Sequence, residues 1–239
     1  MKKIQSKIPL GSARTNWAYF IGFWSALIAT LGGVVYFQVI LMALLANQFT
    51  YPPSNALQLF GGISSLVLCP VLVILMACLH TITPAEKKVF SQISLAFTIL
   101  FAVAVSINRF TQLGVVRQSI ESGRTQGLDW FLPYGDHSIM LGLEMMGWGW
   151  FLGLAMLFAA PLFTKGKVDQ WICGFSILYG VLGLVSSITY LLASPLSVVG
   201  FVAWGLILFI ITALLAVRFK KVQQISIDNL TPVVIGKGE

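Results

Sequence analysis

The sequence predicts an all-α protein, a polytopic membrane bundle of six transmembrane helices with both termini in the cytoplasm. Of the 239 residues, 57% are hydrophobic and only 10% are charged, whereas soluble domains carry about 25% charged residues. The few charges also leave long gaps, and most of the basic ones fall on one side of the predicted helices. This composition excludes an ordinary water-soluble domain, a disordered chain and a disulfide scaffold.

The charge-free runs set the number of helices. Four runs lack Asp, Glu, Lys and Arg, and they cover 71, 20, 20 and 48 residues at 15–85, 89–108, 145–164 and 170–217. A helix that crosses the hydrocarbon core needs about 20 mostly apolar residues. The two long runs therefore hold two helices each, the short runs hold one each, and the total is six.

Proline-containing turns divide the two long runs, at residues 51–55 and 193–195, because Pro lacks an N–H donor and biases its predecessor away from helix. The first helix has about 30 apolar residues, more than the 7–15 of a signal peptide, and is expected to be retained as an anchor. Residues 1–16 are expected to form a cytoplasmic segment and residues 218–239 a cytoplasmic tail. Within a transmembrane domain at 17–217, the six helices are expected at 17–46, 56–79, 90–107, 139–163, 171–193 and 196–217.

The basic residues predict the orientation. Twelve of the 15 Lys and Arg lie on the side of the termini, and three, Arg109, Arg117 and Arg124, lie on the other. The positive-inside rule then places both termini in the cytoplasm and the protein in the cell membrane. The net charge of +7 is scattered over the helix ends, so we expect contact with the lipid bilayer and no binding of nucleic acid.

An outer loop is expected at residues 108–138. Its first part, 109–117, could continue the third helix, and the chain should break at Ser122 and Gly123. The aromatic segment at 128–135 has two interpretations. It is an anchor at the headgroup level, where Trp and Tyr settle, or a lid over a cavity.

Glu144 is the leading candidate for a binding residue. It lies about one and a half helical turns inside the fourth predicted helix, where an unpaired carboxylate is costly and usually functional. Arg109 should leave the third helix at the same depth, so we predict a Glu144–Arg109 pair. His137 precedes Glu144 on nearly the same helical face and should lie above the pair, and Asp136 is a weaker candidate.

Other polar residues fall at a similar depth and predict a polar vestibule that is open to the outside. The polar residues at this depth are Gln38, Asn108, Ser186, Ser187, Thr189 and Tyr190. The alternative is that these residues only join helices by hydrogen bonds.

Glycines in the fourth predicted helix predict close helix packing. Gly149 and Gly153 form a G-x-x-x-G step, which lets another helix approach closely, and Gly147 lies beside it. Similar small surfaces occur at residues 32–33, 61–62, 180 and 183. Glycine-rich faces of this kind could also support a homo- or hetero-oligomer.

No metal, cofactor or catalytic group is expected. Cys78, His80 and Cys173 fall near one side of the membrane, but no fourth ligand lies at a diagnostic spacing. Nucleophile-elbow, H-E-x-x-H, Walker and dinucleotide motifs do not occur in the sequence.

One stretch carries a resemblance to other proteins. Residues 138–163, with Gly147-Trp148-Gly149 and Leu157-Phe158-Ala159-Ala160-Pro161, resemble a family of uncharacterised prokaryotic six-span integral membrane proteins. The resemblance implies a six-span layout. Because that family has no assigned activity, it implies no catalytic residue or cofactor.

Three hypotheses about function remain. The protein binds or transports a small molecule or ion through the outward polar vestibule around Glu144, or it is a structural or accessory subunit that packs against a partner membrane protein. The third hypothesis is a membrane enzyme with Glu144 and His137 as acid–base groups. Their separation by two helical turns argues against it, so an enzyme is the less favoured interpretation.

Overall fold

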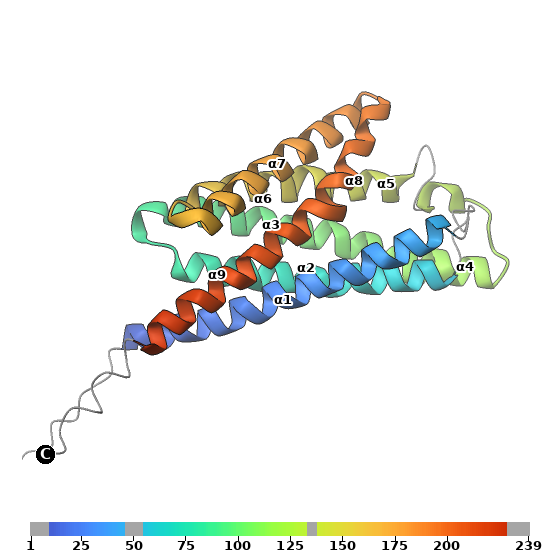
Figure 1. The fold of residues 1–239 in the computed structure, drawn as a ribbon. Coiled ribbons are helices and arrows are strands. Elements are labelled where there is room, and N and C mark those ends of the chain that lie inside the picture. Colours follow the sequence, from blue (N-terminus) through green and yellow to red (C-terminus); the bar gives the residue numbers. More distant parts are fainter. Residues whose placement is uncertain (1–9, 46–54, 133–137, 229–239) are drawn as a thin grey trace, which may run out of the picture.

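The computed structural model describes residues 10–45, 55–132 and 138–228. Within these residues the chain is helical with no β-strand, and six helices are long and apolar enough to cross a membrane (Figure 1). The predicted all-α bundle of six spans is thereby confirmed. The six apolar spans are Asn16–Val35, Leu59–Ile82, Ala85–Glu121, Ile139–Leu162, Gly166–Leu191 and Pro195–Gln223.

Three of the spans are continuous or nearly continuous α-helices, and the other three contain irregular turns. The first, second and fifth spans are α1 (Leu10–Leu45), α2 (Asn55–Ile82) and α7 (Gly166–Leu191). The third consists of η1 (Ala85–Lys87), α3 (Lys88–Phe110), η2 (Thr111–Val116) and α4 (Arg117–Glu121). A short turn, η3 (Leu128–Phe131), follows it.

The fourth and sixth spans are each assembled from shorter helices. The fourth consists of α5 (Ile139–Glu144), η4 (Met145–Phe151), α6 (Leu152–Ala159) and η5 (Ala160–Leu162). The sixth consists of η6 (Pro195–Val199), α8 (Gly200–Val202), η7 (Ala203–Ile207) and α9 (Leu208–Asp228). Of these segments η2, η4 and η7 are π-helical, and η1, η3, η5 and η6 are 3₁₀-helical.

The third span is longer than its charge-free run indicates. Helix was expected to end at Ile107, but it continues without a break to Glu121. The chain then turns through Gly123 and Gly127, whose φ angles of 70° and 75° lie in the left-handed region that favours glycine. The first part of the expected outer loop is therefore helix, as the continuation hypothesis proposed.

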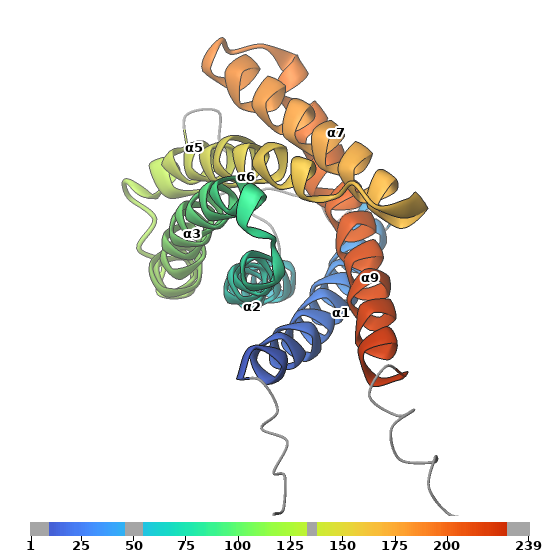
Figure 2. The same ribbon diagram turned by 90° about the vertical axis from the view of Figure 1, so that its left-hand side faces the viewer.

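The six spans pack as a ring in chain order, seen from one end in Figure 2. Each span contacts the next, and α9 returns to pack against α1, so the first and last spans close the ring. A hydrogen bond of 2.9 Å between the hydroxyls of Thr30 and Thr212 lies at this contact. The centre of the ring is filled by apolar side chains, among them Leu72, Phe101 and Tyr179, which are fully buried.

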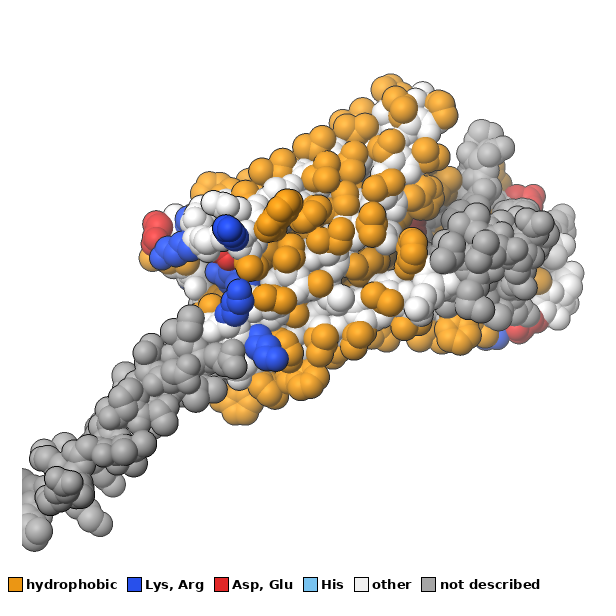
Figure 3. All heavy atoms as spheres, in the orientation of Figure 1, with side chains coloured by type: hydrophobic (Ala, Val, Ile, Leu, Met, Phe, Trp, Pro, Cys, Tyr) orange, Lys and Arg blue, Asp and Glu red, His pale blue; other side chains and the backbone are white. Residues whose placement is uncertain are grey.

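The flank of the bundle is apolar. Large hydrophobic side chains such as Trp17, Phe20, Trp24 and Ile28 are exposed along α1, and Figure 3 shows apolar side chains along the length of the bundle on the face in view. A soluble monomer seldom exposes a large continuous apolar surface. A lipid environment accounts for this surface.

The helix ends where α1 begins and α9 finishes lie at one end of the bundle, here called the termini end, and basic side chains gather there (Figure 3). Asp169 of α7 is buried at this end and accepts a hydrogen bond of 2.9 Å from Nε of Arg218 on α9. The Arg218 guanidinium also lies 5.3 Å from the centre of the Phe163 ring. These contacts fix the fifth span to the sixth.

Candidate functional site

A buried ion pair forms the centre of the site. Arg109, at the end of α3, donates from Nη2 to Oε1 of Glu144, at the end of α5, and the side chains are only 8% and 16% exposed. The predicted Glu144–Arg109 pair is therefore present. A guanidinium and a carboxylate can share such a position because each offsets the cost of removing the other from water.

Two amide side chains complete the network. Asn108 donates from Nδ2 to Oε2 of Glu144 at 2.8 Å and to the backbone carbonyl of Met140 at 2.9 Å. Gln112 accepts a hydrogen bond of 3.1 Å from Arg109 and donates to Oδ1 of Asn108. Both carboxylate oxygens of Glu144 are thus held, and α3 and α5 are joined through charged and polar groups.

The local helix geometry explains why these four side chains meet. Asn108 and Gln112 are four residues apart on one continuous helix, so they lie on the same face. Gln112 belongs to η2, where the helix widens to π geometry directly after α3. A π turn rotates the side chains that follow it and is often found at functional positions.

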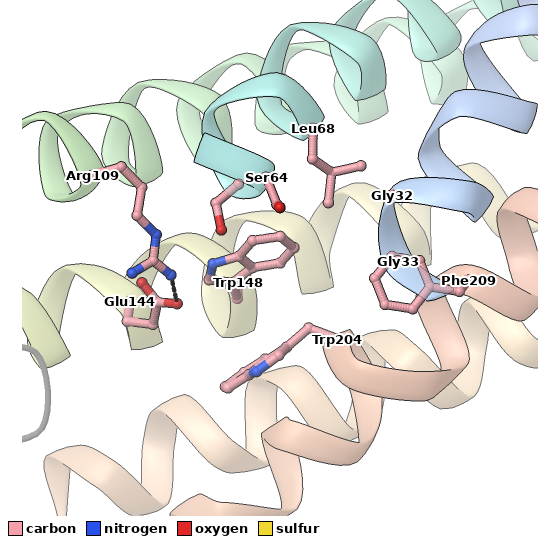
Figure 4. Close-up of a pocket in the computed structure, with 10 residues that line it drawn as sticks. Gly32, Gly33, Ser64, Leu68, Arg109, Glu144, Trp148, Trp204 and Phe209 are labelled. Atoms are coloured by element: carbon pink, nitrogen blue, oxygen red, sulfur yellow. Dashed lines mark hydrogen bonds and ion pairs between the residues drawn. The ribbon is translucent and has the colours of Figure 1, made fainter. Parts of the chain in front are cut away.

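The ion pair borders a pocket inside the ring, and Figure 4 shows its lining. Arg109 and Glu144 lie at one side, Gly33 and Phe209 at the other, and the indole of Trp148 lies between them. The cavity has a volume of about 30 Å³, which is enough for roughly two water molecules. The pocket is lined by Gly32, Gly33, Ser64, Ser65, Leu68, Arg109, Glu144, Trp148, Trp204 and Phe209.

Two of the three π turns in the described residues supply the tryptophans of the pocket. Trp148 lies in η4 and Trp204 in η7, and both are buried. The third π turn, η2, begins two residues after Arg109. Irregular helix therefore occurs in three different spans at the level of this pocket.

Trp148 presents a polar atom to the pocket. Its ring is held edge-on against Phe101, with 4.7 Å between centroids, and its backbone carbonyl accepts a hydrogen bond of 3.0 Å from the Tyr179 hydroxyl. The side chain is 5% exposed, and Nε1 is on the side of the ring that faces Arg109 and Glu144 (Figure 4). This nitrogen lies beside the Glu144 carboxylate and interacts with it, but it forms no hydrogen bond of normal geometry with any described residue.

The pocket reaches the apolar flank of the bundle beside α1. Gly33 is buried because the Phe209 ring lies where a Cβ would be, within 2.0 Å of it. Gly32, the next residue, is exposed, and a Cβ built there meets no atom within 4 Å. The pocket is therefore open at Gly32. Since Gly32 belongs to the first apolar span, this opening faces the hydrophobic side of the molecule.

The remaining predicted site residues are not brought to the pocket by the described structure. Gln38 is on an exposed part of α1 and does not line the pocket. His137 and Asp136 lie outside the described residues. Of the expected ligand-binding residues, the structure therefore brings together Glu144, Arg109 and Asn108.

Two of the other hydroxyls expected in a vestibule, those of Ser186 and Ser187, join neighbouring segments. Ser187 donates to the backbone carbonyl of Met145 at 2.8 Å, and Ser186 donates to that of Ser197. Thr189 donates to the carbonyl of Val185 in its own helix at 2.7 Å. The Ser186 and Ser187 contacts are of the kind that the alternative interpretation expects, whereas the Thr189 contact stays within α7.

The glycines of the fourth span lie in close packing within the bundle. A Cβ on Gly149 would lie 2.8 Å from the Gly183 carbonyl oxygen, and one on Gly153 would lie 3.4 Å from that of Gly180. Gly147 faces α3, where a Cβ would be 2.8 Å from the Val105 side chain. The close approach therefore occurs between spans of one chain.

Metal ligands do not cluster in the described part of the chain. No group of three or more His, Cys, Asp and Glu side chains is found there. Nδ1 of His80 lies 2.8 Å from the Ser91 hydroxyl, and Cys69, Cys78 and Cys173 are free thiols.

Sequence reasoning missed several pocket residues. Gln112 had a detectable signal, because it lies one helical turn after Asn108 and Arg109 if the third helix continues. Trp148 likewise follows Glu144 by four residues. No sequence signal marked Ser64, Trp204 or Phe209, which reach the pocket only through the ring closure of the spans.

Comparisons with known proteins add no relative: no family model matches the sequence, and no curated protein or solved structure matches it either. The resemblance to uncharacterised six-span proteins stays a prediction.

Proposed function

We propose that this protein is a multi-pass protein of the cell membrane that binds a small molecule or ion in the pocket beside Glu144 and transports it. The observation that carries the proposal is a buried ion pair, with both carboxylate oxygens of Glu144 hydrogen-bonded, that forms one wall of a cavity inside an apolar bundle. Ionisable groups within spans are costly, and they commonly mark binding sites or transport pathways.

Stability alone does not favour this arrangement. A buried ion pair is often no more stabilising than apolar residues of the same volume. Asn108 and Gln112 hold the pair in position, which is the preorganisation that a recognition site needs. Trp148 adds an indole N–H beside the Glu144 carboxylate that forms no hydrogen bond of normal geometry with the described residues.

We also propose that both termini lie in the cytoplasm. Twelve of the 15 basic residues belong to the termini side in the six-span topology, which is the asymmetry of the positive-inside rule. Arg109 and Glu144 lie toward the opposite end of the ring, so the pocket occupies the outer half of the membrane in this orientation.

The alternative of an accessory subunit receives less support. It depended on glycine-rich faces for contact with a partner, and Gly147, Gly149 and Gly153 are buried within the bundle. A partner that used this glycine face would have to separate the fourth span from α3 or α7 first.

A ligand screen with matched variants tests the proposal. The purified protein is screened by thermal shift against inorganic ions, carboxylates, amines and sugars. Any ligand that raises its melting temperature should act differently on Glu144→Gln, because that change removes one charge of the site. Asp169→Asn, which disrupts the other buried ion pair, should leave the ligand response unchanged.

A second pair of variants tests whether the ligand occupies the pocket. Gly32→Leu places a bulky side chain at the pocket rim, and Gly174→Leu places one on α7, and neither Cβ meets an atom within 4 Å. We expect the ligand response to fall at least ten-fold in Gly32→Leu alone. The proposal fails if no compound stabilises the protein or if the two glycine variants respond alike.

A further inference from the structure

Within the network around Glu144, the hydrogen-bonding capacity that is left is that of a donor. Each side-chain acceptor in the network already receives a hydrogen bond: Glu144 from Arg109 and Asn108, Asn108 from Gln112, and Gln112 from Arg109. In contrast, the buried Trp148 N–H forms no hydrogen bond of normal geometry with any described residue, and it faces Arg109 and Glu144. A ligand with an electron-rich oxygen that takes the place of Glu144 beside Arg109 can accept from this donor, whereas a cation cannot.

The charges in the pocket also distinguish between ligands. Among the residues that line it, Arg109 is the one cation and Glu144 the one anion, so the site is neutral. A bound cation would lie beside the Arg109 guanidinium and be repelled by it. A bound anion can pair with Arg109. Two negative charges, that of the ligand and that of Glu144, then lie in one low-dielectric site, which is costly unless the Glu144 charge is neutralised.

The titratable groups near Glu144 are few. Arg109 faces it from α3, and the Cys69 thiol of α2 lies within electrostatic reach. On α7, the Tyr179 hydroxyl is engaged with the backbone carbonyl of Trp148. The pocket residues contributed by α1, α2, η7 and α9 are not titratable. Among these groups Glu144 is the one that can take up a proton and thereby lose a negative charge.

We infer that the pocket binds the carboxylate of an organic acid together with one proton. This inference rests on the proposed binding function. The carboxylate replaces Glu144 as the partner of the Arg109 guanidinium, whose planar fork suits a carboxylate, and it accepts the Trp148 N–H. Glu144 takes the proton from solution. The site thus remains neutral, and anion binding is coupled to proton uptake.

The probe is acetate, titrated into the purified full-length protein by calorimetry between pH 6 and pH 8, where carboxylic acids are ionised. Coupling to one proton makes the dissociation constant rise about ten-fold per pH unit, or about 100-fold over this range. Titrations in two buffers of different ionisation enthalpy should give one proton taken up per acetate. A pH-independent dissociation constant, or no proton uptake, overturns the inference.

Variants locate the proton and the anion. Glu144→Gln should bind acetate with a dissociation constant that changes less than about two-fold from pH 6 to pH 8. Arg109→Lys keeps the charge but loses the fork, and its affinity should fall at least ten-fold. Asp169→Asn should retain the wild-type affinity and pH dependence. If Glu144→Gln does not fold, the number of protons that the wild-type protein takes up per acetate still decides whether anion binding is coupled to a proton.

The opening at Gly32 allows the acid to come from water or from the membrane, and a second probe distinguishes these sources. Dodecanoate, presented at pH 8 to protein in lipid nanodiscs, should compete with acetate if the acid enters from the bilayer, whereas binding of acetate alone indicates an acid from water. If neither acid binds, but Gly32→Leu loses the binding of another ligand found in the thermal-shift screen, the inference fails and the proposed function stands. If no ligand binds at all, both fail.

Discussion

Buried hydroxyls in this bundle differ in whether they have a partner. Ser94 on α3 and Ser176 on α7 are both almost inaccessible. The Ser94 hydroxyl donates to the backbone carbonyl of Ala155 at 2.8 Å, but the Ser176 hydroxyl has no partner in the described structure. A buried hydroxyl without a hydrogen bond costs free energy, whereas a satisfied one contributes modestly.

The two serines give a matched prediction for stability. Ser176→Ala should raise the free energy of unfolding by about 1 kcal/mol, because it removes an unsatisfied polar group. Ser94→Ala should lower it by about 0.6–1 kcal/mol, since a bond between α3 and α6 is lost. Unfolding by SDS in mixed micelles measures both changes. A destabilised Ser176→Ala would mean that its hydroxyl has a partner.

Single residues also show where sequence reasoning about the site stops. Glu144 and Arg109 could be paired in advance, because an isolated charge within a span needs a partner at its own depth. The position of Trp148 in the pocket could not be predicted, because a tryptophan in an apolar helix has the same sequence pattern whether its N–H faces a pocket or a neighbouring helix. Its role depends on rotation about the helix axis, which the π turn η4 changes.

At the scale of elements, the fourth and fifth spans approach closely through glycines. A Cβ on Gly183 would lie 2.7 Å from the carbonyl oxygen of Gly149, which is a backbone atom and cannot rotate away. The sequence predicted this packing from the G-x-x-x-G step at Gly149 and Gly153. It did not show that the opposing surface belongs to the same chain, because spacing within one helix does not identify the partner helix.

Gly183→Ala should therefore separate the two helices and lower the free energy of unfolding by about 2 kcal/mol, as overpacking does. Gly174→Ala, on the same helix, meets no atom within 4 Å and should be neutral or stabilising by up to about 1 kcal/mol. Thermal unfolding in detergent compares them. Equal effects of the two substitutions would contradict the packing described here.

The element boundaries show a second limit of the sequence. Charge-free runs identified all six spans, because a bilayer demands uninterrupted apolar length. They placed the end of the third span at Ile107, although helix continues to Glu121. Charges mark where a helix leaves an apolar environment, but the helix itself ends where the backbone needs a left-handed residue, here Gly123.

At the scale of the whole molecule, the packing of the ring does not determine its orientation in the membrane, because the same helix contacts form whichever end of the bundle faces the cytoplasm. We predict that Gly123→Cys is labelled in intact cells by a membrane-impermeant thiol reagent, and Lys165→Cys only after permeabilisation. The wild-type protein is the control, since Cys69 and Cys78 are buried and Cys173 is half-buried. Labelling at position 165 in intact cells would reverse the proposed topology.

The closure of the ring by α9 has a consequence for biosynthesis. Trp204 and Phe209 come from the sixth span, while the opposite walls come from the first four. A ribosome that has released only five spans into the membrane has therefore produced a chain with one side of its cavity missing. Ligand recognition begins after translation is almost complete, and a chain truncated before residue 195 should insert into the membrane but remain unable to bind.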